Sequence, residues 1–463
     1  MSERRIVRYA ATSARLVAGA AVAAAAVVGT VAAIAAPWPQ YSAEPVRLQT
    51  TPAPSDTVLA CDGPLLALGR SADSAGGLSS ASASDIVSGP ADAGASTDTL
   101  SGATGSADGD APVLRAAPRD GIRSSLAAAT SATAASDDLV GFAASACRPP
   151  LAESWLVGGA STTGANDLIE LANPGSVPAT VQLSVYGAQG VSTPPSGQNI
   201  VVAAGERRVV PLAGLLLGEE SPVVRVVSTG APVHAALQAS VTRVLLPGGV
   251  EQVAPIAQAG TRLVMPGVQV IETAVGQAAT LLRLLAPGAD ATATVTLVPV
   301  DAAATAPAPI EVPLTAALPL SIDLSGIAAG TYTVNVTSTE PVVGATWSTT
   351  GFGQGADFAW YAAAPEIVDP SVIAVAPGGG ASVVLAGGAS EANVTLTAVD
   401  GGSPVSAVVG AGASVALPIA DGVYRLETTA PVHAVVAYAG ASALASYPLW
   451  PADSAAAAVT VLP

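Results

Sequence analysis

Apolar and polar residues alternate along short stretches of the chain beyond residue 150. Residues 179–187 read Ala-Thr-Val-Gln-Leu-Ser-Val-Tyr-Gly, and residues 293–301 and 392–400 follow the same pattern. A period of two places every second side chain on one face, as in a strand that lies on a core. Turn sequences such as Asn173-Pro174-Gly175 separate these stretches. The pattern predicts antiparallel β-strands.

Two further motifs recur in a fixed order after each alternating stretch. A short apolar segment comes first, at 208–212, 320–324 and 414–417; a strand that leads into Pro-Val follows, at Pro232, Pro341 and Pro431. Three ordered matches indicate three repeats, starting near residues 151, 261 and 371. Each repeat is longer than the 20–45 residues of a solenoid unit. We therefore predict an all-β fold of three tandem immunoglobulin-like antiparallel β-sandwiches.

The amino-terminal region has a different pattern. Leu16–Ala36 contains no charged residue, follows the basic residues Arg4, Arg5, Arg8 and Arg15, and is closed by Pro37. As a helix this run spans about 31 Å, the thickness of a bilayer core, and the arginines orient its amino end to the cytoplasm. We predict a transmembrane helix at 16–36. The alternative is a signal peptide cleaved after Ala33-Ile34-Ala35, although the run exceeds a usual signal core.

Composition and charge restrict the partners. The formal net charge is −17, and all 17 basic residues are arginine. A chain this acidic gains nothing from neutralising phosphates, so nucleic acid is excluded as a partner. No glycine-rich phosphate loop joins a strand to a helix, which excludes nucleotides and leaves no cofactor to expect.

Two cysteines, Cys61 and Cys147, flank a segment rich in Ser, Ala, Gly and Asp. In an exported chain such a pair most simply forms a disulfide. Because the enclosed residues 71–137 offer little apolar surface, we expect them to form a disordered insert, a plain spacer or an O-glycosylated one. The bond would then hold the strand near Cys61 against the first sandwich, and no separate domain would precede the repeats.

Three segments of the first repeat carry a resemblance. Trp155-Leu-Val-Gly-Gly, Leu168-Ile-Glu-Leu-Ala-Asn-Pro-Gly and Val181-x-Leu-x-Val-Tyr-Gly resemble an actinobacterial family of exported, Ala-rich proteins, the domain of unknown function 5719. The resemblance covers most of residues 55–450, including both cysteines. It implies the envelope of a high-GC Gram-positive bacterium and brings no catalytic residues with it.

Residues that carry chemistry are few. His234 and His433 occupy the same position of two repeats, where the middle repeat has Val343. A position that tolerates valine is a strand position rather than a general base or metal ligand. No Gly-x-Ser-x-Gly motif accompanies these histidines.

Three other patterns have structural explanations. Asp108-Gly109-Asp110 lacks the further oxygens of a calcium loop, and Glu219-Glu220 is a surface pair rather than an acid/base dyad. The sequons at Asn335 and Asn393 lie in strands. We therefore expect no catalytic residue and no metal site, and expect that the protein is not an enzyme.

These observations combine into one predicted organisation. The predicted segments are a cytoplasmic basic tail at 1–15, an anchor or signal segment at 16–36, a linker and first strand at 37–70, the insert at 71–137, and sandwiches at 138–260, 261–370 and 371–463. We expect a single-pass cell-membrane protein, held through residues 16–36, with its bulk outside. Its expected role is structural or binding, with an envelope glycan or a membrane glycosyltransferase as partner; the alternatives are secretion after cleavage and an accessory subunit or enzyme acting on envelope polysaccharide.

Overall fold

In the computed structural model, the described residues are 3–35, 48–50, 54–70, 77–90, 94–102, 110–272, 278–440, 443–451 and 459–461. The chain divides into two units, Met1–Pro52 with Ala457–Pro463, and Ala53–Ala456. The first unit holds helix α1 (Glu3–Ala35) and the antiparallel strands β1 (Leu48–Thr50) and β35 (Val459–Val461).

Helix α1 contains the predicted apolar segment, except for Ala36, which lies outside the described residues. Its stretch Ala10–Ala35 is long and apolar enough to cross a bilayer. Within the described structure these side chains are exposed, as expected for a segment whose apolar surface is covered by lipid or by the export machinery. The helix begins before the predicted span, so the described part of the basic tail is helical as well.

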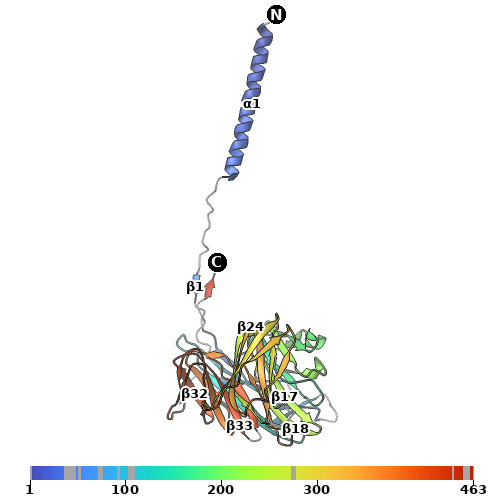
Figure 1. Cartoon of the computed structure of the whole chain (residues 1–463), viewed down its shortest axis with the longest axis vertical. Helices are drawn as coiled ribbons and strands as arrows, with labels where there is room; N and C mark the ends of the chain where they lie inside the picture. Colours follow the sequence, from blue (N-terminus) through green and yellow to red (C-terminus); the bar gives the residue numbers. More distant parts are fainter. Residues whose placement is uncertain are drawn as a thin grey trace. The chain divides into compact units, whose positions relative to one another are not determined.

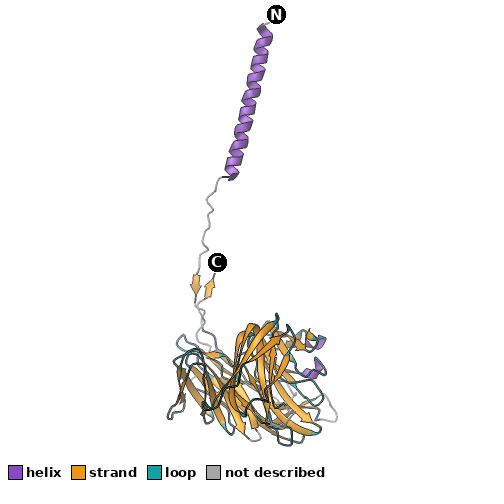
Figure 2. Ribbon diagram, viewed as in Figure 1, coloured by secondary structure: helices purple, strands orange, loops and turns teal. Residues whose placement is uncertain are grey.

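The second unit consists almost entirely of strands (Figure 2). Two sheets face each other over residues 153–253, and their apolar faces form one core. One sheet has the order β10 (Glu153–Val157), β16 (Val223–Thr229), β12 (Ala179–Gly187), β13 (Gly190–Ser192), with β14 (Ile200–Val202) also on β12. The other has the order β15 (Arg207–Pro211), β11 (Leu168–Ala172), β17 (His234–Arg243), β18 (Leu246–Val253).

Two more sheet pairs follow along the chain. In the next pair, one sheet has the order β19 (Gly260–Val270), β24 (Gly330–Thr349), β21 (Ala291–Pro299), β22 (Ile310–Leu314). The facing sheet has the order β23 (Leu320–Asp323), β20 (Thr280–Leu285), the end of β24, β25 (Phe358–Ala362). In the last pair, one sheet has the order β27 (Ser371–Val375), β32 (Gly422–Thr428), β29 (Ala392–Ala398), β30 (Val405–Val409). The facing sheet has the order β31 (Ser414–Pro418), β28 (Ala381–Gly387), β33 (Val432–Gly440), β34 (Ala443–Pro448), and the short β26 (Glu366–Ile367) also pairs with β33.

The predicted alternation appears directly as burial. In β12, Val181, Leu183 and Val185 are buried while Thr180 and Gln182 are exposed. All three sheet pairs share one strand order, and the positions matched in the sequence fall on equivalent strands. The β-sandwich class predicted from the sequence is therefore the observed fold, with strands from all three pairs in one body (Figure 1).

The prediction of disorder at 71–137 is wrong for the described part of that segment. Together with its flanks it forms three small sheets: β2 (Thr57–Ala60), β7 (Ala111–Ala116) and β6 (Ser96–Leu100); β3 (Leu65–Leu68) and β4 (Leu78–Ser82); β5 (Asp85–Gly89), β8 (Ala127–Ala135) and β9 (Val140–Ala146). Small alanine side chains let these strands approach large apolar residues of the last sheet pair. Ala129 and Phe142 share a core with Ile373. The apolar surface that the segment lacks is supplied by its neighbour.

The segment is also more than a surface excursion of the first sandwich. Strand β2 pairs with β7, not with a strand of the first sheet pair. Residues near Cys61 do pack against that pair: the Leu66 N–H donates to the side-chain oxygen of Gln238 at 2.7 Å, and the Gln238 amide donates back to the Leu66 carbonyl at 2.7 Å. Strand β9, however, lies against both β18 of the first pair and β34 of the last.

Candidate functional site

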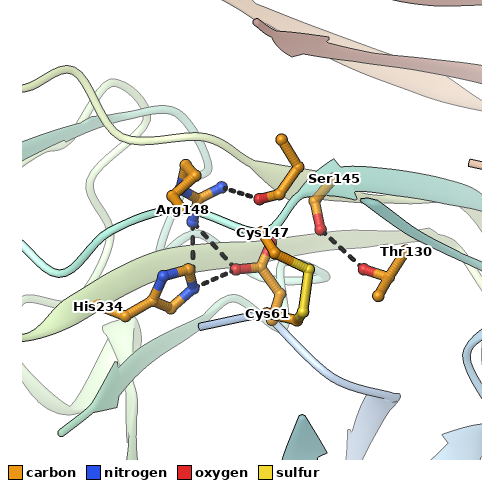
Figure 3. The surroundings of a disulfide bond; sticks show 8 residues. Cys61, Thr130, Ser145, Cys147, Arg148 and His234 are labelled. Carbon is orange, nitrogen blue, oxygen red and sulfur yellow. Dashed lines mark hydrogen bonds and ion pairs between the residues drawn. A yellow bond between two sulfur atoms is a disulfide. The ribbon is translucent and has the colours of Figure 1, made fainter. Parts of the chain in front are cut away.

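The disulfide joins the N-terminal sheets at one point. Cys61 follows β2 and Cys147 follows β9, and their α-carbons lie 4.2 Å apart across 86 positions of sequence (Figure 3). The predicted pairing is present. Beside it the Ala60 and Arg148 backbones form a two-way bridge, with both N···O distances at 2.9 Å.

Buried charged side chains lie beside the disulfide (Figure 3). The Arg148 guanidinium lies 3.0 Å from Asp62, and the His234 Nε2 lies 2.6 Å from the same carboxylate oxygen. Burial by itself would raise the pKa of Asp62, but the charge of Arg148 and the hydrogen bond from His234 together hold it below its usual range. Burial lowers the pKa of His234. The carboxylate therefore stays ionised and ties three separate segments together.

A histidine beside a carboxylate resembles an acid/base pair, yet this one is closed to substrate. The side chains of Asp62, Arg148 and His234 are at most 2% exposed. The nearby hydroxyls of Thr130 and Ser145 bond to each other at 3.2 Å. General acid–base catalysis requires reach to a bound reactant, so the network acts as a structural tie.

The second histidine has a separate environment. His433 Nδ1 lies 2.8 Å from the Ala364 carbonyl, and Val343, the matched residue of the middle repeat, is buried in a core. Within the described part of the chain, no group of three or more His, Cys, Asp or Glu side chains is placed to hold a metal.

The remaining candidates lie apart from one another. Glu219 accepts the Ala188 N–H at 2.8 Å and so closes a loop, while Glu220 is exposed. Asn335 and Asn393 lie in β24 and β29. Asp108 and Gly109 fall outside the described residues.

A cleft lies between the first and second sheet pairs. Its volume is about 180 Å³. Two tryptophans and a phenylalanine, Trp347, Trp360 and Phe358, form its apolar wall. Its polar lining includes Thr162, Asp167, Glu220, Arg243, Arg283 and Ser321. The cleft exists only because segments far apart in sequence converge, and neither the repeats nor a motif predicted it.

Arg283 is the central buried cation of this cleft. Its guanidinium donates to the carbonyls of Gly159, Pro222 and Glu220, each at 2.9 Å, and stacks 4.8 Å above the ring of Trp360. Burial lowers the pKa of Arg283 to about 9. Arg283 was not predicted from the sequence, where its one signal is an arginine within the apolar run Leu281–Leu285.

Asp167 faces the same cleft, and its carboxyl group is held by the backbone on both sides. Its Oδ2 accepts the Ala160 N–H at 2.6 Å and its Oδ1 accepts the Ser240 N–H at 2.9 Å. Burial raises its pKa to about 7, although those two hydrogen bonds and the charge of Arg283 oppose the shift. Since each carboxyl oxygen already holds a backbone N–H, Asp167 shapes the wall of the cleft.

The fold and site thus define a class of protein: a chain of β-sandwich units with an amino-terminal anchor or signal helix, a disulfide and an aromatic cleft. The chain belongs to a family of unknown function, DUF5719, whose model matches residues 103–420.

Among solved structures, the fibronectin domains FN1–FN3 of chicken CNTN1 align with 68% of this chain and 100% of their own, at 12% identity and a TM-score of 0.11. No curated protein matches the chain.

Proposed function

We propose that this chain is a non-catalytic structural and binding protein of the cell envelope, held in the membrane by α1 with its β-sandwich unit outside the cytoplasm. The observation that carries the proposal is the combination of an apolar helix that can cross a bilayer with a buried disulfide. Disulfides persist in oxidising compartments and are rare in cytosolic proteins.

Two further observations support a binding role over an enzymatic one. The Asp62–His234 pair is buried away from solvent, and of the two carboxyl groups that line the cleft, Asp167 and Glu220, Asp167 is held by backbone N–H groups. Glycoside hydrolysis uses two carboxyl groups that face the sugar, whereas both oxygens of Asp167 are engaged by backbone N–H groups. The family assignment is neutral on this point.

Cell fractionation tests the proposal. We expect the full-length chain in the membrane fraction, released by detergent but not by high salt, and degraded by an arginine-specific protease added to protoplasts. Recovery of a full-length, protease-protected chain in the cytosol would refute the proposal. A shortened chain in the medium would instead support cleavage and secretion.

A further inference from the structure

The cleft between the first and second sheet pairs combines an apolar wall with unpaired positive charge. Trp347 lies at this wall, half-buried, with its ring centroid 6.2 Å from that of Phe358. Aromatic faces offer a flat apolar surface with a partial negative charge, which suits the C–H face of a ring-shaped ligand. The wall therefore favours a ligand with one apolar face rather than a flexible chain.

Arg243 supplies the available cation. It is partly buried, stacks 5.1 Å from the Phe352 ring, and makes one long contact, 3.4 Å, to the Gly248 carbonyl. In the described part of the chain it forms no ion pair, and Arg283 forms none either. A guanidinium that is partly desolvated and lacks a carboxylate partner within the protein is well suited to bind the carboxylate of a ligand.

The balance of charge around the cleft selects the kind of anion. Arg283 donates to three carbonyls, and Asp167 and Glu220 line the cleft beside the two arginines. The cleft therefore carries no large excess of positive charge, and Arg243 is the guanidinium left to pair with a ligand carboxylate. The chain as a whole carries −17, which disfavours the approach of a densely charged polyanion. A ligand with a single carboxylate on an otherwise uncharged body fits both conditions.

Polar groups at the rim complete the pattern. The Thr162 hydroxyl and the Glu220 carboxylate line the cleft, and neither side chain has a hydrogen-bond partner among the described residues. They offer a donor and acceptors to ligand hydroxyls. The volume, about 180 Å³, corresponds to roughly six waters at ~30 Å³ each, which is the scale of one sugar ring.

We propose that this cleft binds a carboxylated pyranose, such as a uronic acid residue of an envelope polysaccharide, with its ring face on Trp347 and its carboxylate on Arg243. The inference rests on the proposed function, because such polymers lie outside the cytoplasm. The ligand binds without a covalent step. The remaining arginine, Arg283, fixes the floor of the cleft through Trp360.

The test is a saturation-transfer NMR titration of the full chain in detergent micelles with three probes: glucuronate, glucose as its neutral counterpart, and benzoate as an anion with a flat ring but no hydroxyls. We expect glucuronate to bind at least tenfold more tightly than the other two. Arg243→Gln and Trp347→Ala should each weaken glucuronate binding at least tenfold.

Arg208→Gln is the matched control, since Arg208 is an exposed arginine of the same sheet pair, outside the cleft. It should bind glucuronate as the unaltered chain does, and all variants are compared at equal folded fraction by circular dichroism. Equal affinity for glucose and glucuronate, binding of benzoate alone, or unchanged binding by Arg243→Gln would each overturn the proposal. Membrane localisation is measured separately. A chain that is in the membrane but does not bind glucuronate refutes this site and leaves the proposed function standing, whereas a chain that binds glucuronate but is found in the cytosol refutes the proposed function.

Discussion

The carboxylate of Asp357 accepts the backbone N–H of Phe142 at 3.1 Å, although 215 positions separate the two residues. The same oxygen accepts the Leu444 N–H at 3.1 Å, and the other oxygen lies 3.4 Å from the Val250 nitrogen. These three donors belong to β9, β34 and β18, and Asp357 directly precedes β25. One buried side chain therefore joins the N-terminal sheets to all three sheet pairs.

Replacing Asp357 by alanine tests this junction. The substitution leaves buried N–H groups on three strands without an acceptor, which we expect to destabilise the unit by about 3–5 kcal/mol. Denaturant unfolding followed by tryptophan fluorescence measures the loss. Asp301→Ala is the control, because Asp301 is an exposed turn residue whose carboxylate accepts the nearby Ala303 N–H. Equal stability of the two variants would contradict the role of the junction.

Gly249 makes the close approach of β18 to Asp357 possible. A Cβ there would lie 2.7 Å from Asp357 Oδ1 and 2.7 Å from the Phe358 ring, at a φ of +118°. We expect Gly249→Ala to cost about 3 kcal/mol or more. Gly190→Ala isolates the backbone part, because Gly190 has a φ of +92° but open space around it; it should cost only about 1 kcal/mol. Thermal unfolding distinguishes them, and equal losses would exclude a steric role for Gly249.

Stability should fall as the pH rises. Burial raises the pKa values of Asp167, Glu170 and Asp357 to about 7, whereas in the unfolded chain they lie near 4. Between these values the folded state holds more protons, so its advantage is present below about pH 4 and is lost as the pH rises through about 7. We expect the unfolding temperature to be several degrees lower at pH 8 than at pH 5. A higher value at pH 8 would contradict these shifts.

Glu251→Gln separates one contribution to that pH dependence. Burial raises the pKa of Glu251, and the charge of Asp357 adds to the shift. Glutamine keeps an acceptor for the Ser446 N–H, now 3.4 Å from the carboxylate, but takes up no proton. We therefore expect the variant to gain stability at pH 8 relative to the unaltered chain, with a flatter pH profile. A parallel shift of the whole profile would show that Glu251 titrates as an ordinary carboxyl.

The disulfide should account for a measurable part of the stability. Removing the bond by Cys61→Ala with Cys147→Ala releases a loop of 86 residues, which we expect to cost about 2–5 kcal/mol. Denaturant unfolding of the double variant and of the reduced unaltered chain should agree. If neither differs from the oxidised chain, the bond contributes nothing to the fold.

The sequence predicted those features that depend on local pattern. Alternation in residues 179–187 places Val181, Leu183 and Val185 inside, and the position shared by His234 and His433 marks equivalent strands of two sheet pairs. The cysteine pairing followed from their number and the exported setting.

Features that depend on neighbours distant in sequence were not predictable. Strand β8 reads Ala-Ala-Ala-Thr-Ser-Ala-Thr-Ala-Ala and has almost no apolar surface of its own, so its order depends on packing against the last sheet pair on one side and against Leu65 and Val250 on the other. The cleft likewise depends on Arg283 reaching the Gly159 carbonyl across 124 positions. Composition measures what a segment can bury by itself and not what its neighbours provide.

The absence of lysine permits the most direct test of the central claim, that the β-sandwich unit lies outside the cytoplasm. The unaltered chain carries no side-chain amine. Leu217→Lys places one on the unit at a position that is 78% exposed, and Arg4→Lys places one before the apolar segment without changing its charge. Washed protoplasts are treated with a membrane-impermeant amine reagent before and after permeabilisation.

We predict that Leu217→Lys is labelled on intact protoplasts and that the lysine of Arg4→Lys is labelled only after permeabilisation. If the Arg4→Lys chain recovered from the protoplasts lacks residue 4, the amino-terminal segment has been cleaved as a signal peptide. Protection of Leu217→Lys until the membrane is opened would contradict the account.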